Sequence, residues 1–307
     1  MRSVTLFEWP AGARRTGADP DDDGVTSANV SPTGHQDGAV SNPIRIDDPD
    51  DPRLADFRDL TRADRRPDRP GGRGLVIAEG TVVVRRLLAA PYPLRALLGL
   101  ARRYDELAAD LAGTDAPFYV VDADLMAGVI GFHLNRGVLA TADRIASPPV
   151  DRLLADAPSV AVLEGVNDHE NLGSIFRNAA GLGVGAVLLG EGCADPLYRR
   201  SVRVSMGTVL QVPFASLPWL DPGIELLRRN GFRVVALSPA GECRLSEARL
   251  TGRVAVLVGS EGHGLTEAAL RAADLRVRIP MHRGVDSLNV ATAAAIAFAA
   301  LPAPDAG

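Results

Sequence analysis

Lysine is absent from the 307-residue sequence, so all 33 basic side chains other than the histidines are arginines. Arginine binds phosphate through a planar fork of donors, but a general bias toward Arg and Ala explains the same count, so this absence alone favours no function. Aromatic residues make up only 5% of a chain that is 46% hydrophobic. The interior is therefore expected to consist of Ala, Val and Leu, in an amount sufficient for two domains of ordinary size.

Cysteine and long apolar runs are also scarce. Cys193 and Cys243 lie far apart and in no Cys-x-x-Cys pair, which excludes a paired-cysteine zinc site and a disulfide framework. No apolar run reaches the roughly 18 residues that a membrane span requires, and the N-terminus shows no signal pattern. We therefore expect a cytoplasmic protein with no membrane partner and no metal.

The net charge of -5 is unevenly distributed. Residues 1–60 hold 12 acids and 6 arginines, so the remainder holds 26 acids and 27 arginines, which allows a local basic face without requiring one. Residues 1–42 are rich in Gly, Pro, Asp and Ser and lack apolar periodicity, which predicts a disordered acidic tail. The arginine-rich loop at residues 62–72 either meets an anionic partner or is solvated, and solvation is the simpler interpretation.

Apolar runs then predict two α/β units. The first, residues 43–146, is expected to be a small α/β domain. Its expected strands are residues 75–78, 94–98, 118–121 and 136–140, and its expected helices are residues 81–90, 101–111 and 123–130. Two prolines at 148 and 149 mark the boundary, because each removes a hydrogen-bond donor and restricts the backbone.

The second unit, residues 147–307, contains short apolar runs of the kind found in strands that are buried on both faces. These are residues 160–163, 186–189, 233–237, 254–258 and 275–279. Helix-length segments separate them, so we predict a mostly parallel sheet with helices on both sides. Ligands bind beyond the carboxyl ends of the strands in such sheets.

Three polar segments follow these strands. The first, Asn171-Leu-Gly-Ser-Ile-Phe-Arg177, places an arginine on an otherwise apolar helix, where an ion pair with Glu164 or Glu170 is the simpler alternative to a ligand contact. The second, Gly259-Ser-Glu-Gly-His-Gly264, combines a carboxylate with glycines that permit close backbone approach, or forms only a tight turn.

The third segment runs from Ile279 to Asn289 and leads into an apolar helix that Pro302 ends. Ser287 and Asn289 are candidate helix caps or site residues. The helix has no polar face, so we expect it to be buried on every side, in a core or across a subunit interface.

Together the three segments resemble the TrmH (SpoU) family of RNA ribose 2'-O-methyltransferases within the SPOUT superfamily. The resemblance covers about residues 158–302, and residues 75–141 are similar to the small RNA-binding domain that precedes the catalytic domain in many members. Asn178, His263 and Asp286 depart from the residues that are frequent in the family.

The resemblance implies a SPOUT-type domain with a trefoil knot, S-adenosylmethionine as cofactor, and a homodimer. It implies a catalytic set, which comprises Arg177, Asn171, Glu261, Ser287 and Asn289. It also implies a set of cofactor-binding residues, which comprises Gly259, Ile279, Leu288, Leu237, Ser238, Gly262 and Met281. Arg199, Arg200 and Arg203 either contact RNA phosphates or form a solvated helix face.

The expected function is methylation of a ribose 2'-hydroxyl in RNA. Ribosomal RNA is preferred because the additional N-terminal domain resembles that of ribosomal-RNA members. Two alternatives stay open, a transfer-RNA ribose methyltransferase and a non-catalytic RNA-binding factor that retains the fold. A dinucleotide-binding domain is excluded, because the glycines at 181, 183 and 185 follow a helix and lack the G-x-G-x-x-G spacing.

Overall fold

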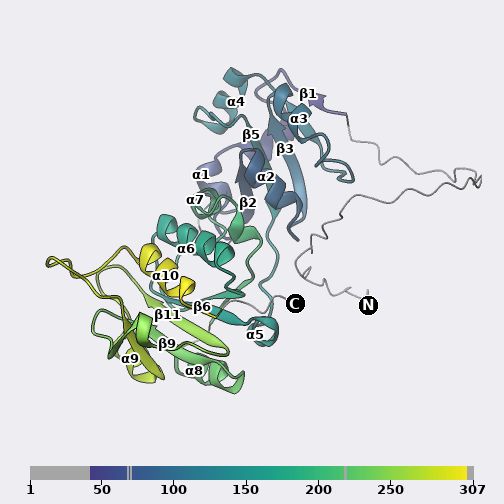
Figure 1. Ribbon diagram of the computed structural model, residues 1–307. Helices are drawn as coiled ribbons and strands as arrows, with labels where there is room; N and C mark the ends of the chain where they lie inside the picture. The colour runs from purple at the N-terminus through teal and green to yellow at the C-terminus, as the bar shows by residue number, and fades with distance from the viewer. Residues whose placement is uncertain (1–41, 68, 70, 218–219, 303–307) are drawn as a thin grey trace, which may run out of the picture.

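The computed structural model describes residues 42–67, 69, 71–217 and 220–302. Figure 1 shows two sheets, one above the other, with helices between them. The tail predicted at residues 1–42 lies outside the described residues, apart from Asn42. In the described part of the chain, no helix is long and apolar enough to cross a membrane.

The first sheet has the order β1-β4-β3-β5-β2, and its strand β5 runs antiparallel to β2 and β3. Its strands are β1 (Ile44–Arg45), β2 (Leu75–Glu79), β3 (Leu94–Gly99), β4 (Phe118–Val120) and β5 (Val138–Asp143). Its helices are α1 (Leu60–Ala63), α2 (Thr81–Leu88), α3 (Ala101–Leu107) and α4 (Ala123–Ile130), preceded by the 3-10 turn η1 (Pro52–Phe57). We call residues 42–146 the N-terminal unit.

The second sheet has the order β10-β12-β9-β11-β6-β7-β8, and every pairing in it is parallel. Its strands are β6 (Ser159–Glu164), β7 (Ala186–Leu189), β8 (Phe214–Ser216), β9 (Arg233–Leu237), β10 (Cys243–Arg244), β11 (Val254–Gly259) and β12 (Leu275–Arg278). Its helices and 3-10 turns are α5 (Val150–Asp156), α6 (His169–Gly181), α7 (Arg199–Val204), η2 (Thr208–Leu210), α8 (Leu220–Arg229), η3 (Leu245–Glu247), α9 (Glu267–Ala272) and α10 (Val290–Ala299). We call residues 147–302 the C-terminal unit. The mostly parallel α/β fold predicted from the sequence is confirmed, whereas the trefoil knot and the domain boundary stay predictions.

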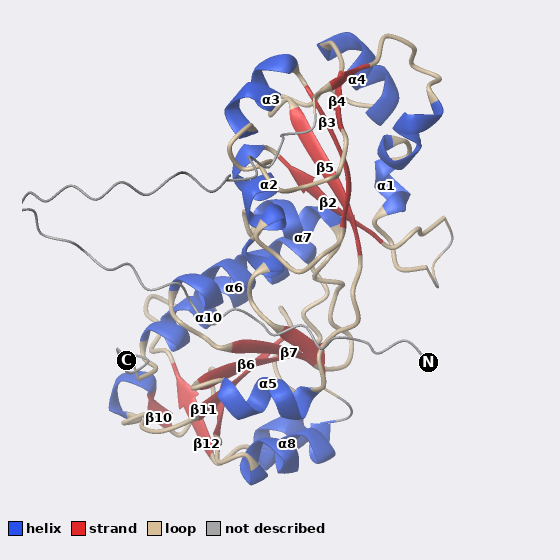
Figure 2. Ribbon diagram, turned by 90° about the vertical axis from the view of Figure 1, so that its right-hand side faces the viewer, coloured by secondary structure: helices blue, strands red, loops and turns tan. Residues whose placement is uncertain are grey.

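The central strands of the parallel sheet are apolar on both faces because helices cover both. Alternate residues point to opposite faces of a strand, so Ala161 and Leu163 join one apolar cluster, whereas Val160 and Val162 join another. Figure 2 shows α6 and α10 on one face of this sheet and α5 and α8 on the other. This two-sided burial explains why β6 and β11 read as unbroken apolar runs.

The predicted elements differ from the observed ones mainly at their ends. Helix α3 stops at Leu107 rather than at residue 111, strand β12 stops at Arg278, and the last strand of the first sheet begins at Val138. The edge strands β1, β8 and β10 were not predicted, because a strand of two or three residues is too short to show an alternation of apolar and polar residues.

Helix α10 is only partly buried in the single chain, so it is not a core helix, and its burial across a subunit interface stays a prediction. It packs through Ala291, Ala294 and Phe298, but Ile296 on another face is 39% exposed. The reason is that α10 lies against α6 and no other described helix covers its outer face.

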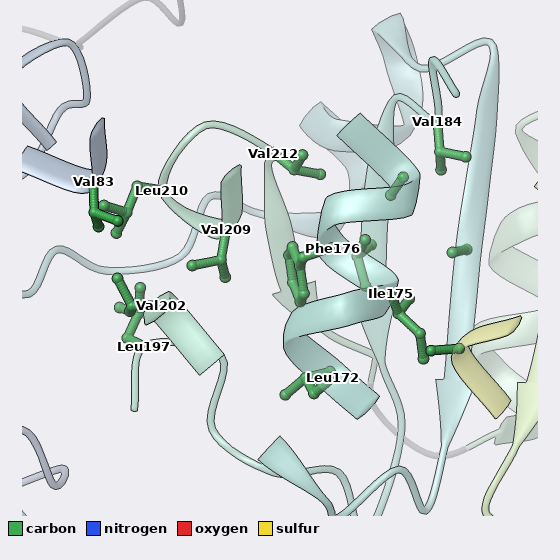
Figure 3. Packing of buried hydrophobic residues seen from close by; sticks show 14 of the residues in the cluster. Val83, Leu172, Ile175, Phe176, Val184, Leu197, Val202, Val209, Leu210 and Val212 are labelled. Carbon is green, nitrogen blue, oxygen red and sulfur yellow. The ribbon is translucent and has the colours of Figure 1, made fainter. Parts of the chain in front are cut away.

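The two units share an apolar junction built by α7 and η2. Figure 3 shows Val83 of α2 beside Leu210 of η2, while Val209 lies between this contact and Phe176 of α6. All four side chains are buried and belong to the same apolar cluster. The segment that follows β7 therefore joins the N-terminal unit to the parallel sheet.

A polar junction lies beside the apolar one. Arg199 Nη1 pairs with Glu79 Oε1 at 2.9 Å, and the Arg199 backbone N–H donates to Asp64 Oδ2 at 2.5 Å. Arg144 of the N-terminal unit pairs with Asp195 at 2.8 Å. The Glu79 carboxylate is only 4% exposed, so Arg199 neutralises a charge that water does not reach.

This burial predicts unequal effects of two neighbouring substitutions. Arg199→Ala is expected to lower the free energy of unfolding by about 3 kcal/mol, because Glu79 would stay buried without its cation. Arg200→Ala removes an ion pair with Glu170 in which both side chains are 53% exposed, so its effect on the free energy of unfolding is expected to be much smaller. Urea denaturation followed by circular dichroism measures both, and equal losses would show that the Arg199 pair is not structural.

Candidate active site

Three loops of the C-terminal unit meet at the carboxyl ends of β9, β11 and β12 and enclose a cavity of about 720 Å³. They are residues 237–240, 258–265 and 279–290. This is the edge of a parallel sheet where ligands are expected, and the volume lies within the range of about 300–1,000 Å³ that is usual for small-molecule sites.

All seven residues predicted to bind a cofactor line this cavity, although they come from three separate segments. They are Leu237, Ser238, Gly259, Gly262, Ile279, Met281 and Leu288. Glu261, Ser287 and Asn289 of the predicted catalytic set line it as well. Asn171 and Arg177 are not among the lining residues.

The side chain of Asn289 ties three segments together at the cavity wall. Its Oδ1 accepts hydrogen bonds from the first backbone N–H groups of α10, at 3.0 Å from Ala291 N and 3.2 Å from Thr292 N. Its Nδ2 donates to Asn171 Oδ1 at 2.7 Å and to Glu261 Oε1 at 2.6 Å. We call Asn171, Glu261 and Asn289 the polar cluster.

The polar cluster keeps hydrogen-bonding capacity for a ligand. Within the described part of the chain, no hydrogen bond engages Asn171 Nδ2 or Glu261 Oε2, and both side chains are at least partly exposed. The Asn289 side chain, by contrast, is fully used by the protein. Asn289 therefore positions its neighbours, while one donor and one acceptor beside it remain for substrate or cofactor.

The loop after β11 comes close to its own backbone. A Cβ atom at Gly259 would lie 2.1 Å from the carbonyl carbon of Gly264, a distance that only the absence of a side chain allows. Gly262 and Gly264 have positive φ angles of +87° and +69°. These glycines fold the loop back so that Glu261 reaches the polar cluster.

Two hydrogen-bonding side chains fix helix α6, one at its own N-terminus and one against α10. Asp168 caps its N-terminus by accepting from Glu170 N at 2.9 Å and Asn171 N at 2.8 Å. Asn178 Nδ2 donates to Ala291 O at 2.9 Å. We did not predict either role, although Asp168 directly before a helix is a readable cap signal.

Arg177 makes neither of the ion pairs that the sequence offered as alternatives. Glu170 pairs with Arg200, and Glu164 accepts hydrogen bonds from Thr266 N at 2.8 Å and Thr266 Oγ1 at 2.9 Å. Among the described residues, Arg177 has no ion pair or side-chain hydrogen bond, and its side chain is exposed. The guanidinium is thus available on the surface of α6.

Three further predicted residues, Ser287, Arg199 and Arg200, have surroundings that differ from those expected of them. Ser287 is exposed on the loop before α10 and does not cap the helix, because Asn289 occupies the cap position. Of the three arginines predicted to contact RNA, Arg199 and Arg200 have partners within the chain, whereas Arg203 is exposed and has none among the described residues.

The electrostatics of the cavity favour a cationic ligand. Its lining includes the carboxylates of Glu261, Glu267 and Asp286 and no arginine, together with apolar side chains such as Leu237, Ile279 and Leu288. No group of three or more His, Cys, Asp or Glu side chains that could hold a metal ion occurs in the described ranges.

Comparison with known proteins identifies the chain. The sequence profile of the SpoU rRNA Methylase family matches residues 158–299. An uncharacterized tRNA/rRNA methyltransferase of Mycobacterium tuberculosis is 62% identical over 255 residues, which are 82% of this chain and 88% of that protein. The 23S rRNA (guanosine-2'-O-)-methyltransferase RlmB of Shewanella oneidensis is 32% identical over 167 residues, 53% of this chain and 68% of that protein.

A solved structure shows the same fold over most of the chain. The AdoMet-bound rRNA methyltransferase from Sinorhizobium meliloti superimposes with a TM-score of 0.72 and 24% identity, over 83% of this chain and 96% of that one. The sequence relatives, the matched profile and the shared fold agree with one another, and the chain belongs to the SpoU methylase family.

Proposed function

We propose that this protein transfers a methyl group from S-adenosylmethionine to a ribose 2'-hydroxyl of RNA, with ribosomal RNA as the substrate. The observation that carries the proposal is the convergence of all seven predicted cofactor residues on one cavity, whose wall also holds Glu261 and Asn289 of the polar cluster. The family to which the chain belongs consists of methylases, which supports the reaction class.

The cavity fits this cofactor in charge and in polarity. S-adenosylmethionine carries a sulfonium and an ammonium group against one carboxylate, so its net charge is positive, and three carboxylates line the cavity. Leu237, Ile279 and Leu288 supply apolar surface for the adenine. When bound, the cofactor supplies an electrophilic methyl group and leaves as a neutral thioether.

The residues of the chain then have separate roles. Asn171 Nδ2 and Glu261 Oε2 are the open hydrogen-bonding groups of the polar cluster and orient the reactants. The Arg177 guanidinium favours the negative charge that develops on the attacking ribose oxygen. Arginine stays protonated in proteins, so we assign it this electrostatic role rather than that of a general base, and the proton of the hydroxyl passes to solvent water.

We also propose that the protein acts as a homodimer through α6 and α10. Thr292, Ile296 and Ala299 form an exposed stripe along α10, and Leu182 at the end of α6 is 40% exposed. A second copy would cover this apolar stripe. Arg177 lies on α6 and does not line the cavity. An interface along α6 and α10 would also bring Arg177 to a reaction centre.

Ribosomal RNA is preferred over transfer RNA on the strength of the relatives. RlmB, which is named as a 23S rRNA (guanosine-2'-O-)-methyltransferase, matches this chain over 68% of its length. We propose that the N-terminal unit binds this RNA and that the protein works in the cytoplasm, where such RNA is available.

The first experiment is transfer of labelled methyl from S-adenosylmethionine to total RNA from cells that lack the protein, followed by mapping of the modified nucleotide. Label at one ribose of ribosomal RNA is the expected result. Label in transfer RNA would identify the alternative substrate. Failure to bind S-adenosylmethionine in equilibrium dialysis would replace the enzyme proposal by the non-catalytic one.

Removal of the Arg177 guanidinium tests its electrostatic role. Arg177→Ala is expected to lower kcat about 10²- to 10³-fold at saturating RNA, the usual loss when one charge-stabilising donor is removed. Affinity for S-adenosylmethionine should stay unchanged, because Arg177 does not line the cavity. Arg229→Ala on α8 is the matched control, since Arg229 is also exposed. Wild-type turnover in Arg177→Ala would remove Arg177 from the catalytic set.

Neutralising Glu261 tests the electrostatic fit of the cofactor. In Glu261→Gln the side-chain carbonyl still accepts from Asn289 Nδ2, so the polar cluster is retained while one negative charge is lost. We expect at least about tenfold weaker binding of S-adenosylmethionine, equivalent to about 1.4 kcal/mol, by isothermal titration calorimetry. Glu225→Gln, at an exposed position on α8, should bind as the wild type does. Unchanged affinity in Glu261→Gln would show that its charge does not face the cofactor.

A further inference from the structure

Helix α7 lies between the N-terminal unit and the first turn of α6, which carries Asn171 of the polar cluster. On one side, Arg199 of α7 is paired with Glu79 and bonded to Asp64, both of the N-terminal unit. On the other side, α7 packs directly on α6, and Figure 1 shows it between the first sheet and that helix. The proposed reaction assigns α7 no role.

Ser201 of α7 is completely buried and contacts the first turn of α6 at two points. Its Oγ donates to the carbonyl oxygen of His169, the first residue of α6, at 3.2 Å, whereas the carbonyl oxygen of Asp195 is 3.5 Å away. The Ser201 carbonyl oxygen lies so close to Gly173 that a Cβ atom there would be 2.7 Å from it. Asn171 stands midway between these two contacts.

The first three residues of α6 are weakly held by packing. Glu170 is exposed, and His169 and Asn171 are half-buried. His169 lines a second cavity, of about 710 Å³, whose walls come from both units. A segment with so little buried surface depends for its position on the hydrogen bonds that it makes.

The hydrogen bonds of this turn have different effects. Asp168 accepts from the backbone N–H groups of Glu170 and Asn171, but it is adjacent in the sequence, so it fixes the shape of the turn and not its place. The ion pair between Arg200 and Glu170 joins α7 to α6 but is exposed and therefore weak. The bond from the Ser201 hydroxyl joins the same two helices and is shielded from water.

The open donor of the polar cluster, Asn171 Nδ2, moves with this turn. Asn171 Oδ1 accepts from Asn289 Nδ2 at 2.7 Å, so a shift of the turn changes the position of the amide or breaks this bond. A displacement of about 1 Å at a reaction centre can lower the rate about 10²-fold. The position of Asn171 Nδ2 therefore depends on Ser201, which is not among the residues that line either cavity.

We infer that Ser201 is a positioning residue for methyl transfer. Its hydroxyl holds the first turn of α6 in place and thereby aims Asn171 Nδ2 at the reactants. Because α7 is also bonded to the N-terminal unit through Arg199, one short helix places this donor and anchors that unit. The inference rests on the proposed function, because it takes Asn171 to orient the reactants.

Removal of the hydroxyl tests this role. Ser201→Ala keeps the backbone contact with Gly173 and loses the bond to His169. We expect kcat at saturating RNA and S-adenosylmethionine to fall about tenfold. The Kd for S-adenosylmethionine, measured by isothermal titration calorimetry, should stay that of the wild type, because Ser201 does not line the cavity.

Ser205→Ala is the matched control. The Ser205 hydroxyl is also buried and donates to a backbone carbonyl, that of Val202 at 3.0 Å, but this bond stays within the α7 segment. Its kcat should equal that of the wild type. Wild-type kcat in Ser201→Ala would overturn the inference, and so would an equal fall of kcat in Ser205→Ala.

A double-variant cycle separates positioning from a general loss of stability. If Ser201 acts through Asn171, its removal has no further effect once Asn171 is replaced by alanine. The single-turnover rate of the double variant Asn171→Ala, Ser201→Ala should then lie within about twofold of that of Asn171→Ala alone. A further tenfold fall in the double variant would show that Ser201 acts by another route.

Hydrogen exchange reports on the same turn without any turnover. The Leu172 backbone N–H donates to the Asp168 carbonyl oxygen at 2.9 Å. In Ser201→Ala, a peptide that spans residues 168–174 should exchange about fivefold faster by mass spectrometry, the effect of losing one neutral hydrogen bond. The same peptide should exchange at the wild-type rate in Ser205→Ala. Unchanged exchange in Ser201→Ala would mean that the hydroxyl does not hold the turn.

The two proposals fail in distinguishable ways. If the wild type transfers no methyl group to RNA, the proposed function fails, and hydrogen exchange still decides whether Ser201 holds the turn. If the wild type methylates RNA and Ser201→Ala does so at the same kcat, the positioning role fails alone.

Discussion

The hydrogen bonds of one amide, Asn289, hold the candidate active site together. Its oxygen caps α10, and its nitrogen holds Asn171 of α6 and Glu261 of the loop after β11 within 2.7 Å. The three segments are far apart in the sequence, and each follows a different strand of the parallel sheet. Loops at the edge of a sheet can otherwise move separately. Because Asn289 is hydrogen-bonded to both of the other segments, the three form one preorganised surface.

The parallel sheet supplies the rigidity that this arrangement needs. Strands β6 and β11 pair along their whole length and are buried on both faces, and the site lies at their carboxyl ends. The N-terminal unit is attached to this frame through an apolar contact at Val83 and a buried ion pair at Arg199. The arginines on the loop after α1 are thereby held opposite the sheet edge.

Much of this could be predicted from the sequence, for identifiable reasons. Unbroken apolar runs predicted the parallel strands, because strands that are buried on both faces are apolar at nearly every position and do not alternate with polar residues. The motifs around Asn171, Glu261 and Asn289 pointed to the polar cluster through their resemblance to a family, since no periodicity joins residues so far apart. For the outer face of α10 the sequence left a core and a subunit interface open, because composition shows that a helix is apolar but not what covers it.

Other features were beyond the reach of the sequence. Arg199, Arg200 and Arg203 follow one another at nearly helical spacing, yet one joins a buried pair, one an exposed pair, and one has no partner among the described residues. Which of them is engaged depends on where Glu79 and Glu170 lie in space. The cavity lined by Arg144 of the N-terminal unit and Tyr198 of the C-terminal unit could not be predicted either. Its walls come from two units that only tertiary packing brings together.

The first turn of α6 is a partition between two cavities of similar size. His169 faces one of them, while Asn171 is bonded to residues that line the other. Any coupling between occupants of the two cavities through this turn would be reciprocal, because thermodynamic linkage requires each occupant to change the affinity of the other by the same factor.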